Sequence, residues 1–162
     1  NSRPHARAVS PEDQATMLVG AYVPAWTHHE VTEQVPAEKF DDTVERIASA
    51  AGLDVSRPFI FTIEGEFTDV RLHVINGTCP IHARMKKTEL SEQSRPFEDE
   101  LPKVSGKVVG VFAKDAVGNL THPATSTHIH LLYTDLATGK MITGHLEQIG
   151  LQKGVTLSLP QK

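Results

Sequence analysis

The chain has 162 residues, of which 39% are hydrophobic and 22% are charged, and its formal net charge is −4. This length suits one domain with a sizeable core. The acidic balance argues against the basic surface of a nucleic-acid-binding protein, and no apolar run reaches the roughly 18 residues that a membrane span requires. We therefore expect a soluble globular protein whose partners are neither nucleic acid nor membrane.

Residues 1–14 carry two prolines and show no periodicity. They predict a flexible N-terminal arm, followed by a single domain over 15–162. Because the chain begins at Asn1 rather than Met, we expect an extracytoplasmic rather than a cytoplasmic location. The single Cys79 excludes an internal disulfide and is expected to be a small, half-buried apolar residue rather than a nucleophile.

A strand is predicted over 17–22, and a packing helix begins after Pro36 and ends at Gly52. Apolar residues recur along this helix at helical spacing: Phe40, Val44, Ile47 and Ala51. Between the two elements, His28 and His29 lie in a polar stretch. Adjacent strand residues point to opposite faces, so at most one of them can join a site, and we expect solvent exposure.

Alternating apolar residues predict four further strands, over 59–67, 70–74, 107–112 and 155–159. Arg71 and His73 share the face of the second of these strands that is opposite to its apolar residues. The polar segment 77–102 is either an active-site lid or a solvated loop, and 113–126 reads as a Gly- and Pro-containing loop. Substrate specificity would come from these two loops.

A β-hairpin near the C-terminal end carries three histidines. His128 and His130 alternate along one strand, so they point to the same face. His145 joins them if the chain folds back. Paired residue numbers in an antiparallel ladder have a constant sum, so placing His130 opposite His145 also pairs Asp135 with Lys140 around a four-residue loop. Three imidazoles then converge on one metal ion.

The same register places Glu147 opposite His128. Glu147 is therefore a candidate for a fourth ligand, a partner of a ligand or an acid/base group. A bulge at Gly144 would shift the register and remove this pairing. Three neutral imidazoles suit Zn²⁺, and other divalent transition metals are possible. They leave a coordination position open for water or substrate, which indicates chemistry rather than a structural role. The alternative is a solvated polar strand face, because the chain has nine histidines.

The chain resembles the zinc half of α-acetolactate decarboxylase, from about residue 17 to 159, in an ordered set of short motifs: Ile63-Glu64-Gly65-Glu66-Phe67, Val70-Arg71-Leu72-His73-Val74, Phe97-Glu98-Asp99-Glu100, Val104-Ser105-Gly106-Lys107-Val108-Val109-Gly110, Thr127-His128-Ile129-His130 and Gly144-His145-Leu146. The resemblance implies a mixed α/β fold. With the predicted elements, we expect an α+β single domain with a mixed, mainly antiparallel, partly closed sheet and one packing helix.

The resemblance also implies that His128, His130 and His145 are zinc ligands. The gap before the third histidine is four residues longer here than in the family, and an even difference preserves which face each residue occupies. The family's active-site arginine aligns with His73, two residues from Arg71. Its catalytic glutamates belong to an N-terminal part and a C-terminal extension that lie outside the resemblance.

A second resemblance is to single-domain plant- and prokaryote-conserved (PPC) proteins, which have a similar HxH followed by Gly-His-Leu. These proteins often form trimers, so a homo-oligomer, dimer or trimer, is implied. Their plant members carry arms with a Gly-Arg-Pro core. Ser2-Arg3-Pro4 lacks that glycine, which disfavours DNA binding.

Three hypotheses follow. The first is a zinc-dependent carboxy-lyase acting on a small 2-hydroxy-3-oxo acid or related carboxylate, in which zinc is the Lewis acid. Arg71 would anchor the carboxylate, and His73 or Glu147 would move protons. The structural alternatives are a surface ion pair for Arg71, a polar strand-face residue for His73 and a solvated edge residue for Glu147. The second hypothesis is a metal-binding module without turnover, and the third is a PPC-like interaction protein whose histidines bind no metal.

Overall fold

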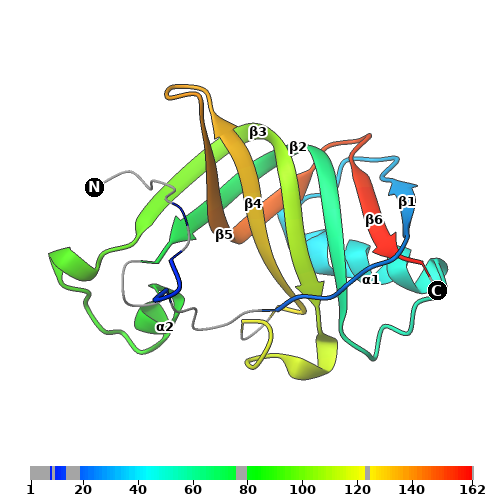
Figure 1. Cartoon of the computed structure of the whole chain (residues 1–162), viewed down its shortest axis with the longest axis horizontal. Coiled ribbons are helices and arrows are strands. Elements are labelled where there is room, and N and C mark those ends of the chain that lie inside the picture. Colours follow the sequence, from blue (N-terminus) through cyan, green and yellow to red (C-terminus); the bar gives the residue numbers. More distant parts are fainter. Residues whose placement is uncertain (1–7, 9, 14–18, 76–79, 123–124, 162) are drawn as a thin grey trace.

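After residue 58 long strands dominate the chain, and the sheet that they build curls back on itself (Figure 1). The computed structural model describes residues 8, 10–13, 19–75, 80–122 and 125–161. Its strands are β1 (Trp26–Glu30), β2 (Phe59–Val74), β3 (Phe97–Phe112), β4 (Thr127–Asp135), β5 (Lys140–Leu151) and β6 (Thr156–Pro160). Its helices are α1 (Phe40–Ala50) and α2 (Pro80–Met85), with 3₁₀ turns η1 (Ala37–Lys39), η2 (Glu92–Ser94) and η3 (Lys114–Ala116).

The strands are ordered β1-β6-β2-β3-β4-β5, and every pairing between them is antiparallel. β5 also pairs with β2, so β2, β3, β4 and β5 form a partial ring. This arrangement confirms the predicted α+β fold with a mainly antiparallel, partly closed sheet and one main helix. None of the helices in the described part of the chain has the length and apolar character that a membrane crossing requires.

The predicted packing helix is α1, and it covers the hydrophobic core. Its buried residues are Phe40, Thr43, Val44 and Ala48, and the Phe40 ring lies 6.4 Å from the Phe61 ring of β2. Ala51, which the spacing placed on the buried face, is exposed just beyond the helix end. The chain then leaves the helix at Gly52, whose φ of +83° favours glycine. The predicted stop is therefore confirmed.

The two strands predicted over 59–67 and 70–74 are one continuous strand, β2. Asp69 has a φ of +50°. The buried apolar residues change from odd to even positions there: Phe67 is buried before it, and Val70 and Leu72 are buried after it. The alternation therefore breaks without the strand ending, because β3 keeps pairing on both sides of Asp69.

The polar segment 77–102 is not one long loop. It contains α2, and β3 begins at Phe97 rather than at Lys107. The ladder between β2 and β3 keeps one register from Phe59↔Phe112 to Val74↔Phe97. Backbone hydrogen bonds to β2, rather than a strong apolar pattern, extend the strand into this acidic stretch.

The predicted strand over 17–22 is wrong for the residues that the structure describes, since 19–22 are not a strand. β1 instead covers Trp26–Glu30, where it pairs with β6, and β6 itself confirms the strand predicted at 155–159 to within one residue. Cys79 and residues 1–7, 9 and 14 of the predicted arm lie outside the described residues.

The predicted β4–β5 hairpin is confirmed with its register. His130 pairs with His145 and Asp135 with Lys140, around the four-residue loop 136–139. The Asp135 side chain accepts hydrogen bonds from the Ala137 N–H at 3.1 Å and the Thr138 hydroxyl at 2.7 Å. Gly139 has a φ of +66°, as a tight turn requires at this position.

Candidate metal centre

A row of imidazoles crosses three neighbouring strands. His145 of β5 pairs directly with His73 of β2 on one side and with His130 of β4 on the other. His128 lies two residues before His130 on β4, and its ring centroid is 4.6 Å from that of His145. His122, from the loop before β4, adds a fifth imidazole, 4.6 Å from His145. We call these five residues the histidine cluster.

Several nitrogens in the cluster are close enough to share one ion. Ligand atoms of His122, His128 and His145 all lie within 4.8 Å of one another. The Nδ1–H of His128 donates to the Leu120 carbonyl at 3.2 Å, which turns its Nε2 toward the cluster. That Nε2 lies 3.3 Å from Nε2 of His130. Two nitrogens bound to one tetrahedral zinc ion are about 3.3 Å apart, so this pair also fits a shared metal.

Burial keeps the central imidazoles neutral. His145 is 7% exposed, and burial, reinforced by the neighbouring imidazoles, lowers its pKa to about 2. His73 is 1% exposed, and burial likewise lowers its pKa. The Nε2 atoms of both residues are buried without a hydrogen-bond partner among the described residues. Buried polar atoms normally have partners, and a neutral imidazole nitrogen is a metal ligand, so this cluster fits a metal ion.

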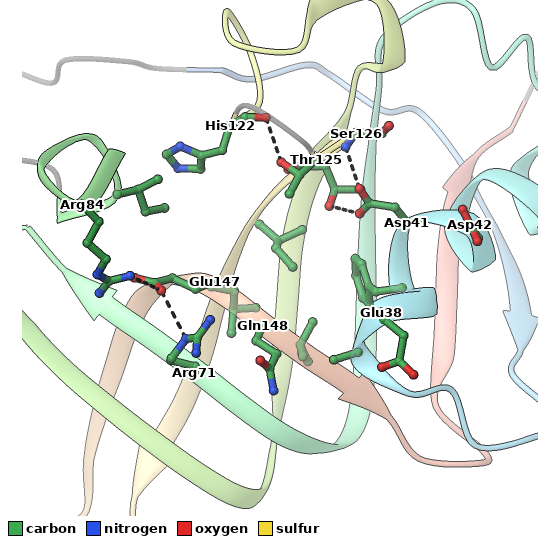
Figure 2. A pocket seen from close by; sticks show the side chains of 17 residues that line it. Glu38, Asp41, Asp42, Arg71, Arg84, His122, Thr125, Ser126, Glu147 and Gln148 are labelled. Atoms are coloured by element: carbon green, nitrogen blue, oxygen red, sulfur yellow. Dashed lines mark hydrogen bonds and ion pairs between the residues drawn. The ribbon is translucent and has the colours of Figure 1, made fainter. Parts of the chain in front are cut away.

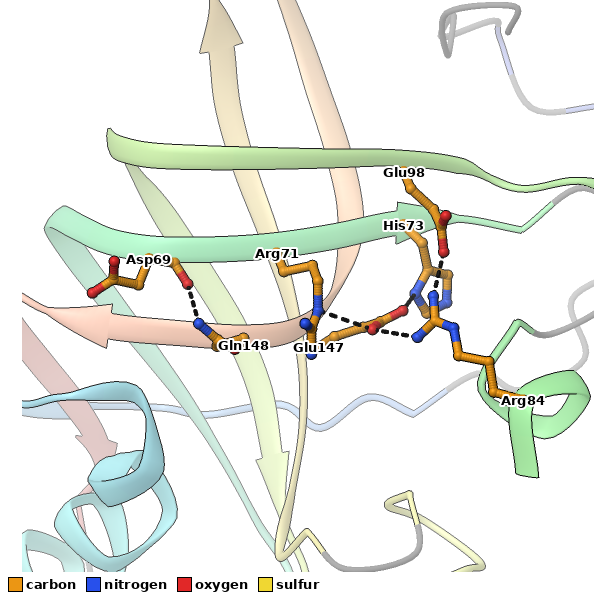
Figure 3. Close-up of polar contacts among 7 residues, drawn as sticks. All are labelled: Asp69, Arg71, His73, Arg84, Glu98, Glu147 and Gln148. Carbon is orange, nitrogen blue, oxygen red and sulfur yellow. Dashed lines mark hydrogen bonds and ion pairs between the residues drawn. The ribbon is translucent and has the colours of Figure 1, made fainter.

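Glu147 lies beside the cluster at a bulge of β5. Arg71 pairs with Gln148 and Leu72 with Leu146, so Glu147 is the extra residue between them. Its Oε1 accepts a hydrogen bond from Nδ1 of His73 at 2.8 Å (Figure 3). The carboxylate is therefore directed at His73.

Two arginines hold the other oxygen of Glu147. Its Oε2 lies 2.7 Å from Nη1 of Arg84 in α2 and 3.2 Å from Nε of Arg71, and Arg84 also pairs with Glu98. The Glu147 side chain is 6% exposed. Its burial would raise the pKa of the carboxyl, but the hydrogen bond and charge of Arg84, followed by His73, outweigh burial and lower that pKa. Glu147 is thus held as an ionised carboxylate.

The predicted pairing of Glu147 with His128 is not formed. The β4–β5 ladder starts at His130↔His145, and His128 pairs with Val111 of β3 instead. The bulge lies at Glu147 and not at Gly144. An extra residue in β5 moves the carboxylate from β4 toward β2, where it meets His73.

The structure brings together all six residues predicted for the site. His128, His130 and His145 gather in the histidine cluster, and Arg71, His73 and Glu147 are linked as described above. Glu147 and His73 are buried rather than solvated. The two adjacent histidines of β1 remain outside the cluster. His28 is exposed as predicted, but His29 is half-buried.

Sequence reasoning missed His122 and Arg84, because each lies in a segment without periodicity. His122 falls in the loop predicted over 113–126. Asp41 of α1 anchors the end of that loop by accepting the Ser126 N–H at 2.6 Å and the Thr127 hydroxyl at 2.5 Å. No pattern in the sequence signals this contact, which joins residues more than 80 positions apart.

A cleft of about 570 Å³ adjoins the cluster (Figure 2). Arg71, Arg84 and Glu147 line one end, and Glu38 and Asp42 line the other. His122 also lines it, and so do several apolar residues: Phe40, Ile81, Ile129, Leu146 and Ile149. The cleft therefore offers cationic, anionic and apolar surface next to the cluster, with the two arginines at one end.

Solved structures with a similar fold include an α-acetolactate decarboxylase from Bacillus subtilis strain 168. The two share 14% identity with a TM-score of 0.56, over 84% of this chain and 52% of that chain. The chain has the fold of that region. A Staphylococcus aureus protein of unknown function, described as similar to α-acetolactate decarboxylase, has a TM-score of 0.54 at 14% identity, over 90% of this chain and 55% of its own. The resemblance stated from the motifs is thus confirmed as a structural relationship.

A PPC protein from Pyrococcus horikoshii matches with a TM-score of 0.45 at 13% identity, over 90% of this chain and 86% of that chain. No protein-family model matches the sequence, and no curated protein matches it. The chain spans about half the length of the decarboxylase structure.

Proposed function

We propose that the protein binds zinc, or another divalent transition metal, through His128, His130 and His145. We further propose that it acts as a metal-dependent lyase on a small 2-hydroxy-3-oxo acid or a related carboxylate. The observation that carries this proposal is the convergence of imidazoles on His145, whose buried Nε2 has no hydrogen-bond partner among the described residues, beside a cleft that two arginines line. His128 is half-buried and His130 is exposed at the rim of this group.

The donor set fits the proposed chemistry. Imidazole nitrogens suit zinc, and three protein ligands leave a position for substrate. When bound, the metal supplies Lewis acidity that polarises a carbonyl or carboxylate oxygen.

Arg71 is the proposed anchor for the substrate carboxylate. Its contact with Glu147 runs through Nε, which leaves the edge formed by the two Nη atoms to bind a carboxylate in the cleft. A guanidinium binds a carboxylate with two parallel hydrogen bonds, so it fixes the orientation of the substrate as well as its position.

His73 and Glu147 form the proposed proton-handling pair. The hydrogen bond from Nδ1 of His73 to Glu147 sets the tautomer, so Nε2 carries the lone pair and can accept a proton. The carboxylate would stabilise the imidazolium that forms, while Arg84 holds the carboxylate in place.

Turnover by zinc-loaded, untagged protein tests this function. We expect carbon dioxide release from acetolactate or related 2-hydroxy-3-oxo acids, with His130→Ala lowering kcat/KM at least about 100-fold, as loss of metal-site groups does. Arg71→Lys should chiefly raise KM, since an ammonium cannot form the two-point contact. His28→Ala, which removes an exposed histidine of β1, should leave the rate unchanged.

Two results would contradict the proposal. A rate unaffected by His130→Ala would show that the turnover came from elsewhere. Retention of metal without carbon dioxide release from any of these acids would instead favour a metal-binding module without turnover.

A further inference from the structure

We propose that His122 is a fourth, exchangeable metal ligand, carried by the loop before β4, and that a small carboxylate displaces it from the cleft side. The inference rests on the proposed metal site and extends it. It assigns the resting site four imidazoles and identifies the one that leaves when a ligand binds.

The spacing of four rings supports a shared ion. Imidazoles on one tetrahedral ion have ring centroids about 5 Å apart. The centroid of His122 lies 5.4 Å from that of His128 and 4.6 Å from that of His145. His130 lies 5.3 Å from His128 and 5.2 Å from His145. His122 and His130 therefore sit at equivalent distances from the same pair of histidines.

Nε2 of His145 is a second and independent observation. It is buried without a hydrogen-bond partner among the described residues, and its ring meets that of His122 nearly edge-on, with 71° between the ring planes. Ligand atoms of His122, His128 and His145 come within 4.8 Å of one another. An ion bound by Nε2 of His145 would thus lie within reach of His122.

The four histidines differ in how their backbones are held. His128, His130 and His145 belong to strands paired inside the sheet, so they cannot move without breaking ladder hydrogen bonds. His122 belongs to a loop, where its carbonyl accepts hydrogen bonds from the backbone N–H and the hydroxyl of Thr125, each at 3.1 Å. The loop positions His122 but is not part of a ladder, so this ligand can leave at the lowest cost in backbone hydrogen bonds.

The cleft indicates what takes its place. Of the four histidines, only His122 lines the 570 Å³ cleft, and Arg71 and Arg84 line the same cleft (Figure 2). A carboxylate bound by the Nη edge of Arg71, which the contact between Nε and Glu147 leaves open, approaches the cluster from the side that His122 occupies. Displacement of His122 would therefore open the coordination position that the proposed substrate needs.

Cobalt- and zinc-loaded untagged protein tests this proposal by spectroscopy and not by activity. Zinc-edge X-ray absorption should count four imidazoles in wild type and in the control His28→Ala, and three in His122→Ala. Metal affinity should fall at least about tenfold in His122→Ala. Added imidazole should restore the wild-type cobalt spectrum of this variant, and saturating acetate should lower the imidazole count of the wild type to three.

Each alternative outcome is distinguishable. Metal bound by three imidazoles in wild type, with unchanged affinity and spectrum in His122→Ala, would overturn the fourth ligand while the metal site stands. Four imidazoles that persist in saturating acetate would overturn the exchange. A folded wild-type protein that takes up no metal would overturn both this inference and the proposed function. Circular dichroism of His122→Ala confirms that the variant is folded before the comparison is made.

Discussion

Replacing His145 with leucine should abolish stabilisation by zinc while leaving the metal-free protein at least as stable as wild type. The side chain is buried, and its Nε2 lacks a hydrogen-bond partner among the described residues. Without metal, this burial of a polar atom opposes folding, so an apolar side chain of similar size removes the penalty. With zinc at 1,000 times Kd, binding should stabilise the wild type by about 4 kcal/mol and raise its Tm by roughly 8–16 °C.

Thermal unfolding with and without zinc measures both effects. The control is His28→Leu, which removes an exposed histidine of β1 and should keep the full response to zinc. If His145→Leu kept the zinc-dependent rise in Tm, metal binding would not involve this cluster. If His145→Leu strongly destabilised the metal-free protein, the buried imidazole would have a structural role instead.

Removing the Glu147 carboxylate should give the largest loss of stability on the site side of the sheet. Glu147→Ala leaves the Nδ1–H of the buried His73 unpaired. It also removes the anion that Arg71 and Arg84 share, so their two positive charges are no longer compensated there. Breaking a buried pair from one side costs about 3–5 kcal/mol. Both guanidinium groups are about half exposed and partly screened by water, so we expect about 2–3 kcal/mol.

Urea unfolding of metal-free protein measures this loss in the free energy of unfolding. Glu64→Ala is the matched control, because it removes a glutamate from an exposed ion pair with Lys107 and should cost less than about 1 kcal/mol. Glu147→Gln should recover part of the loss, since its amide oxygen still accepts the His73 N–H. Equal losses in Glu147→Ala and Glu64→Ala would show that the Glu147 network contributes no more than a surface pair.

The parts of the fold that sequence reasoning predicted correctly depend on local periodicity. The α1 helix, the β6 strand and the β4–β5 register follow from residue spacing and turn chemistry within a few tens of residues. The pairing of His130 with His145 required only that a ladder keep a constant sum and that a four-residue turn close it. Local spacing therefore placed His128, His130 and His145 in one cluster, but the group whose ligand atoms all lie within 4.8 Å of one another contains His122 in place of His130.

The remaining features depend on contacts that no local pattern contains. The change of phase at Asp69 predicts a break between two strands, whereas the strand runs through it because of pairing with β3, which is a distant contact. The extra residue at Glu147 likewise became evident only through its pairing with β2. Arg84 and His122 reach the site from irregular segments, so their roles are set by tertiary packing.

The most direct test of the metal centre is the zinc content of the untagged 162-residue chain. The protein would be equilibrated with zinc, desalted against a weak chelator and analysed for metal while its fold is checked by circular dichroism. We predict one tightly held zinc ion per chain, lost in His145→Leu and kept in His28→Leu. A folded wild-type protein that retains no zinc, or retains it equally in both variants, would contradict the account.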